Sequence, residues 1–150
     1  MGRDYVMLKV KRRELEKMYK THYQVYLEAN AEESSLNYSH YLLLFYTIEC
    51  NLKALIIKRK KKKNTTDALF KHKEYGEKLR QDGHDIKYML KILNNNSYRK
   101  LRTLQCKNFQ GAPPKEYNQV WRYGIETEKE IESEIVEELE KIANWIKEAG

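Results

Sequence analysis

Apolar and polar positions follow one another along most of this chain with the spacing of α-helices. Between about residues 5 and 31, apolar side chains recur every three or four positions, which predicts a helix with one buried face. From Tyr41 to Ile57 nearly every position is apolar, on all sides of a helix, with Ser34 or Ser35 as candidate N-caps. The second segment is therefore expected to be the central core helix.

This apolar segment is too interrupted for a membrane span. A spanning helix needs about 20 predominantly apolar residues, whereas Glu49, Asn51 and Lys53 fall inside this one. We therefore expect a core helix and no contact with a membrane.

The middle of the chain gives shorter patterns. Thr66 or Asp67 can cap a short helix that frays towards Gly76 and ends by Gly83. A compact helix is predicted from Ile86 to Leu93, stopped by three asparagines at 94–96. Residues 98–110 are predicted to form a basic helical piece, followed by a Gly/Pro loop at about 111–114 and one or two helical turns over 117–121.

The last helix has the clearest pattern. Thr127 with Glu130 three residues later forms a capping-box signature, which predicts that the helix begins there. Its apolar positions repeat at steps of four and three and lie on one stripe: 135, 139, 142, 146 and 149. Such a stripe can face the domain core or a dimer seam, and we expect a homodimer.

Composition narrows the fold class to all-α. Six Gly and two Pro among 150 residues leave few turns, which disfavours sandwiches and barrels. A hydrophobic share of 41% is too high for a disordered chain, and the length suits one domain spanning residues 1–150. Two cysteines in no recognisable spacing, and no pattern of a signal peptide, make the cytoplasm the expected compartment.

Charge is distributed unevenly. The net charge is +7, but residues 126–150 carry nine Glu and three Lys, whereas the first 125 residues carry 26 basic and 13 acidic side chains. This balance predicts a polyanion or an acidic protein surface as partner. The candidate RNA-binding residues are Lys58, Arg59, Lys60, Lys61, Lys62 and Lys63 in the basic loop at about 58–65, with Arg99 and Arg102. A solvated helix tip is the alternative.

Glu49 and Lys53 stand one helical turn apart inside the apolar segment. A buried carboxylate is costly unless it is paired and hydrogen-bonded, so both residues need partners. We expect Glu49 to be buried and to bond the segment at His84, or an Arg such as Arg122. The four histidines, at 22, 40, 72 and 84, lack a zinc-binding spacing, so we predict no metal, and no cofactor motif is present.

Three motifs together resemble the HEPN (higher eukaryotes and prokaryotes nucleotide-binding) domain. Residues 49–55 resemble that family's Glu-x-x-Leu-Lys-Ala-Leu, and residues 83–86, Gly-His-Asp-Ile, are similar to its Thr-His-Asp-Leu helix start. Residues 122–124, Arg-Tyr-Gly, are similar to its Arg-Tyr-Pro before the final helix. The resemblance covers most of the chain and implies an up-and-down bundle of four to five helices.

The resemblance also implies a function. HEPN domains are commonly homodimers of toxin–antitoxin and phage-defence systems, sometimes beside a nucleotidyltransferase partner, and many are metal-independent RNases. Their RNase signature is an Arg followed four to six residues later by His, and no His follows Arg122 at that spacing. If the protein is catalytic, His84 is the candidate general base, with Arg80 or Arg122 stabilising the phosphorane charge.

A structural role competes with the catalytic one. In that interpretation Glu49, Lys53, Asp85 and Tyr123 form a polar core, and His84 bonds Glu49 at the helix start. The leading hypothesis is a HEPN-type protein that binds RNA or a nucleotide-bearing partner in a stress or defence system. The alternatives are a non-catalytic subunit that docks an acidic partner and a degenerate metal-independent endoribonuclease.

Overall fold

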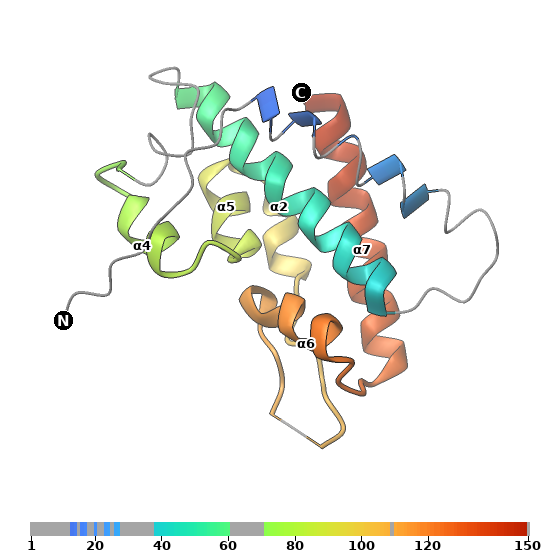
Figure 1. The fold of residues 1–150 in the computed structure, drawn as a ribbon. Coiled ribbons are helices and arrows are strands. Elements are labelled where there is room, and N and C mark those ends of the chain that lie inside the picture. The colour runs from blue at the N-terminus through green and yellow to red at the C-terminus, as the bar shows by residue number, and fades with distance from the viewer. Residues whose placement is uncertain are drawn as a thin grey trace.

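The computed structural model describes residues 38–60, 71–108 and 110–149, with nine further residues between 13 and 27. Over these residues the chain forms five α-helices and two 3₁₀-helices, and the β-pairing among them is limited to two isolated bridges. The predicted all-α class is confirmed. The elements are α2 (Tyr38–Lys60), α4 (Gly76–Gln81), α5 (Ile86–Ile92), η1 (Asn96–Lys100), η2 (Pro114–Glu116), α6 (Tyr117–Tyr123) and α7 (Lys129–Ala149) (Figure 1).

Helix α2 is the core helix that its apolar pattern predicts. Five of its apolar side chains are 0% exposed: Leu44, Phe45, Ile48, Leu52 and Ile56. It contacts α5, α6 and α7, and Figure 1 shows it running across α7 with the two shorter helices beside it. By length and hydropathy α2 could cross a membrane, but 61% of its apolar window is buried inside the protein. That burial is consistent with a soluble protein.

Helix α7 packs the predicted stripe against α2. Ile135, Leu139, Ile142 and Ile146 are at most 1% exposed, and Ala149 packs at the edge of the same core. The stripe is therefore the interior of one chain. Facing the core is one of the two roles that its spacing allows, and the homodimer stays a prediction.

The predicted capping box at Thr127 is wrong. Thr127 pairs with Cys106 in an antiparallel bridge, supported by hydrogen bonds from Lys107 N to Glu126 O and from Glu128 N to Gln105 O. Its hydroxyl is buried and has no partner among the described residues. Because residues 126–128 are held extended by this pairing, α7 begins only at Lys129.

The predicted basic helix over residues 98–110 is also wrong. The 3₁₀-helix η1 ends at Lys100, and the chain then extends and pairs Leu104 with Ala112 through two backbone hydrogen bonds. A Cβ at Gly111 would lie 2.4 Å from Thr103 Cγ2, so a larger residue here would require the exposed Thr103 side chain to shift. Leu101 and Leu104 have helical spacing but are buried from an extended segment.

The remaining short elements lie close to the predicted positions. Residues 61–70, which hold the predicted cap at Thr66 or Asp67, are outside the described residues; α4 begins at Gly76, where fraying was expected. Helix α5 ends before Asn94, which adopts a left-handed φ of 57°. Gly124 ends α6 at φ 64°, and so turns the chain towards α7.

The N-terminal segment packs on α7. All nine described residues between 13 and 27 are helical, in agreement with the helix predicted over 5–31. The Tyr26 hydroxyl donates to Glu140 Oε2 at 2.7 Å, and Tyr23 donates to Asn144 Oδ1 at 3.1 Å. Burial and the neighbouring Glu140 raise the pKa of Tyr26 well above its ordinary value. The candidate caps Ser34 and Ser35 are outside the described residues.

Candidate functional site

Helix α2 places three polar side chains along one face. Tyr46, Glu49 and Lys53 are separated by three and four positions, so they lie one above another on the helix. Lys53 Nζ donates to Glu49 Oε2 at 2.8 Å. The expected pairing of Glu49 with Lys53 is therefore present.

His84, just before α5, hydrogen-bonds the other oxygen of the Glu49 carboxylate. Its Nδ1 lies 2.6 Å from the second carboxylate oxygen, Glu49 Oε1. Glu49 is only 7% exposed, whereas the His84 side chain is 45% exposed. The prediction that Glu49 is buried and bonded to His84 is confirmed, and the imidazole spans from a buried charge to solvent.

The pKa of Glu49 is lowered. Burial alone would raise it, but the hydrogen bond from His84 and the charge of Lys53 outweigh that effect. Glu49 is therefore an ionised carboxylate at neutral pH, with each oxygen accepting one hydrogen bond. Since a carboxylate only accepts, we assign a proton to His84 Nδ1, and in the neutral imidazole this leaves Nε2 as an acceptor.

Tyr46 connects this pair to Arg122. The His84 ring lies 6.4 Å from the Tyr46 ring, centroid to centroid. The Arg122 guanidinium, in the last turn of α6, donates to the Tyr46 hydroxyl and lies 5.9 Å from its ring centroid. An acid–base group and a permanent cation thus flank one tyrosine. We call Tyr46, Glu49, Lys53, His84 and Arg122 the His84 cluster.

Three other predicted residues lie outside this arrangement. Arg80 is exposed near the end of α4. Asp85 is 8% exposed and caps α5, because its Oδ1 accepts from Tyr88 N at 3.0 Å and its Oδ2 pairs with Lys78. Tyr123, the last residue of α6, is 70% exposed, so its expected place in the polar core is wrong.

The basic residues at the end of α2 differ in what they contact. Lys58 and Arg59 are exposed. Arg59 donates to the Leu93 carbonyl at 3.0 Å and lies 6.0 Å from the Trp145 ring, so it ties α2 to the end of α5. The side chain of Lys60, and Lys61, Lys62 and Lys63 entirely, lie outside the described residues.

Arg99 and Arg102 are both engaged by neighbours. Arg99 Nε donates to the Tyr98 hydroxyl at 3.3 Å, and Arg102 pairs with Glu134 on α7. Both side chains stay exposed, as does the carboxylate of Glu134. An exposed pair of this kind is weak, so a phosphate can displace it at little cost.

The role of Tyr46 was missed by sequence reasoning. A tyrosine in an apolar helix ordinarily packs in the core. Tyr46 belongs to the site because its hydroxyl accepts a hydrogen bond from Arg122, which is 76 positions away in the sequence. Its spacing of three from Glu49 was the available signal. Among the described residues, no group of three or more His, Cys, Asp or Glu is placed to hold a metal ion.

The comparisons with known proteins place the chain in no family. No protein-family model matches it, and no curated protein or solved structure matches it either. The resemblance to the HEPN domain therefore rests on the three sequence motifs, each of which contributes a residue to the His84 cluster: Glu49, His84 and Arg122.

Proposed function

We propose that the protein is a HEPN-like RNA-binding protein of a prokaryotic stress or defence system, acting in the cytoplasm, and that it cleaves RNA at the His84 cluster. The observation that carries the proposal is the hydrogen bond of 2.6 Å between a half-exposed imidazole and a buried carboxylate. A histidine held in one tautomer by a carboxylate is the arrangement of a general base.

The chemistry follows from the free Nε2 atom. His84 Nε2 takes the proton of a ribose 2′-hydroxyl, and the resulting oxygen attacks the adjacent phosphorus. The bond from phosphorus to the 5′-oxygen breaks, that oxygen is protonated from solvent, and a 2′,3′-cyclic phosphate remains. Arg122, whose guanidinium lies 5.9 Å from the Tyr46 ring centroid, is the cation that in this proposal stabilises the negative charge developing on the phosphorane.

RNA binding is supported by the charge balance. The first 125 residues carry twice as many basic as acidic side chains, and the described Lys58, Arg99 and Arg102 are exposed. Contacts of this kind are made to phosphates and carry little base information. Affinity for RNA should therefore fall steeply with salt, with a log–log slope of about −0.7 for each phosphate contacted.

The test is cleavage of a labelled single-stranded RNA in EDTA by the full chain. We expect His84→Asn to lower the cleavage rate by about 100-fold or more, and Arg122→Gln to lower it at least about 10-fold. His72→Asn is the matched control, since His72 lies outside the His84 cluster, accepts from the Glu74 backbone N–H and stacks on Tyr75. A contaminating nuclease would not respond to any of these changes.

Other outcomes decide between the alternatives. RNA that binds but is not cut, with the same affinity in His84→Asn, would contradict the catalytic proposal and leave an RNA-binding protein. Absence of RNA binding at low salt would contradict both parts and favour a subunit that docks an acidic protein, such as a cognate nucleotidyltransferase.

A further inference from the structure

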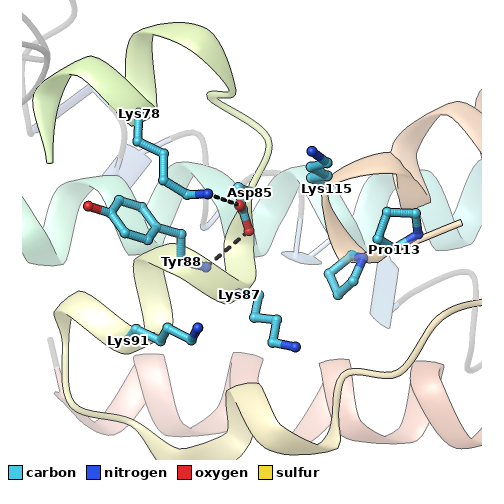
Figure 2. A pocket seen from close by; sticks show the side chains of 8 residues that line it. Lys78, Asp85, Lys87, Tyr88, Lys91, Pro113 and Lys115 are labelled. Atoms are coloured by element: carbon cyan, nitrogen blue, oxygen red, sulfur yellow. Dashed lines mark hydrogen bonds and ion pairs between the residues drawn. The ribbon is translucent and has the colours of Figure 1, made fainter.

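A hollow beside α5 is lined by four lysines. Lys78 comes from α4, Lys87 and Lys91 from α5, and Lys115 from η2, with Asp85, Tyr88, Pro113 and Pro114 completing the wall. Its volume is about 280 Å³. Figure 2 shows the two α5 lysines on one side of the hollow and Lys115 with Pro113 across from them. We call this the lysine pocket.

The positive charge of the pocket is only partly neutralised. Asp85 is the one acidic residue of the lining, and it is occupied by Lys78 at 3.4 Å and by the Tyr88 backbone N–H. Lys115 pairs with Asp82 at 3.6 Å. Lys87 and Lys91 form no ion pair with any residue that the structure describes. Two ammonium groups one helical turn apart on α5 therefore repel each other at the edge of the hollow.

The walls favour a compact anion. Pro113 and Pro114 present ring carbons, and Lys78 Nζ lies 4.9 Å from the centroid of the Tyr88 ring. Such low-dielectric walls strengthen the field of the lysines inside the hollow relative to that on an open surface.

Tyr98 lies at the edge of this region, and the positive charges of the same lysines affect the pKa of its hydroxyl. Its pKa is lowered, chiefly by the hydrogen bond from Arg99, with smaller contributions from Lys91 and Lys87. Lys91 Nζ lies 5.1 Å from the Tyr98 ring centroid, and the Arg99 guanidinium lies 5.6 Å from it. The positive region thus continues from the lysine pocket to Arg99.

We propose that the lysine pocket binds a terminal oligophosphate, the diphosphate or triphosphate end of a larger molecule. Lysine ammonium groups bind phosphate as point charges, and a chain of two or three phosphates concentrates several negative charges in a small volume. A single-stranded RNA backbone carries its charges along a line, so it binds better to an extended open surface than to a small hollow. The site is distinct from the His84 cluster and does not require that the protein cleaves RNA.

The first experiment measures binding of inorganic tripolyphosphate to the full chain by calorimetry at low salt. We expect the double variant Lys87→Gln/Lys91→Gln to bind at least about 10-fold more weakly than the parent. The control Lys107→Gln/Lys147→Gln removes the same charge from exposed positions that do not line the pocket. An equal loss in the two double variants, or no binding by the parent, overturns the proposal.

All four lysines are partly or fully exposed, so both double variants should fold, and their melting temperatures check this. His84→Asn should bind tripolyphosphate as the parent does, which separates this site from the proposed cleavage. A loss of tripolyphosphate binding in His84→Asn would contradict a separate pocket.

The source of the phosphates is resolved by competition. RNA with a 5′-triphosphate, the same RNA with a 5′-hydroxyl, and a free nucleoside triphosphate are each used to displace tripolyphosphate. We expect displacement by a triphosphorylated molecule at concentrations where the 5′-hydroxyl RNA has no effect. Equal displacement by the 5′-hydroxyl RNA would show that the pocket does not distinguish a terminus from the backbone, and the proposal fails.

Discussion

Glu49→Ala should destabilise the protein by about 2 to 4 kcal/mol, because it removes the acceptor of two charged hydrogen bonds. His84 would lose its partner at 2.6 Å, and Lys53, whose side chain is 13% exposed, would be left beside an apolar cavity. For a domain of this size that corresponds to a fall in melting temperature of about 4 to 16 °C. Thermal or denaturant unfolding measures it.

The control is Glu137→Ala, the same change in an exposed pair. Glu137 lies 3.9 Å from Lys141 on α7 and its side chain is 71% exposed, so its loss should cost less than about 0.5 kcal/mol. A Glu49→Ala protein that melts within about 2 °C of the parent would contradict a structural role for the carboxylate.

Acid should reduce the difference between the parent and Glu49→Ala. The pKa of Glu49 is lower in the folded protein than its ordinary value of 4.5, so the folded state favours the ionised form. The stability that this gives is complete above that ordinary value and is lost as pH falls through the folded pKa. Unfolding measured from neutral pH to values below 4.5 should show the two proteins converge.

Leu139→Ala should destabilise the protein by about 2 to 5 kcal/mol, the cost of emptying a fully buried leucine site. Leu139 is 0% exposed and stands at the middle of the α7 stripe, facing the core that α2 provides. Because the stripe is the interior of one chain, this loss should be independent of protein concentration. Unfolding at two concentrations about 100-fold apart tests that independence.

The control is Ile131→Ala, since Ile131 lies one helical turn before the stripe, is only partly buried, and its truncation should cost less. If the parent gains stability with concentration and Leu139→Ala abolishes the gain, the stripe is a dimer seam, contrary to the packing seen in this structure.

The Glu49–His84 bond could be predicted because a carboxylate in an apolar helix has few ways to be satisfied. Its Lys53 partner is local, one turn away, and His84 stands at the start of another short helix, where the chain must pass close to the core. Helix α2 and the stripe of α7 were predictable for a related reason. A long apolar pattern with helical spacing can be buried only if the segment forms a helix and turns its apolar face to the core.

The errors share a different cause. Leu101 and Leu104 have the spacing of a helix, and Thr127 with Glu130 has the spacing of a capping box, but both segments pair with each other through Cys106. Backbone pairing between positions about 20 apart is invisible to local periodicity. The lysine pocket was missed for the same reason, since Lys78 and Lys115 are brought to α5 only by the fold.

If RNA binds at the His84 cluster, the His84 imidazole must respond to it. The most direct measurement is the NMR signal of this imidazole during titration with a 2′-O-methylated RNA, which cannot be cleaved. We predict that the Cε1–H resonance shifts, saturates with the measured binding curve, and does so only at a much higher RNA concentration in Arg122→Gln. RNA that saturates the protein while the His84 resonance stays unchanged would contradict the account.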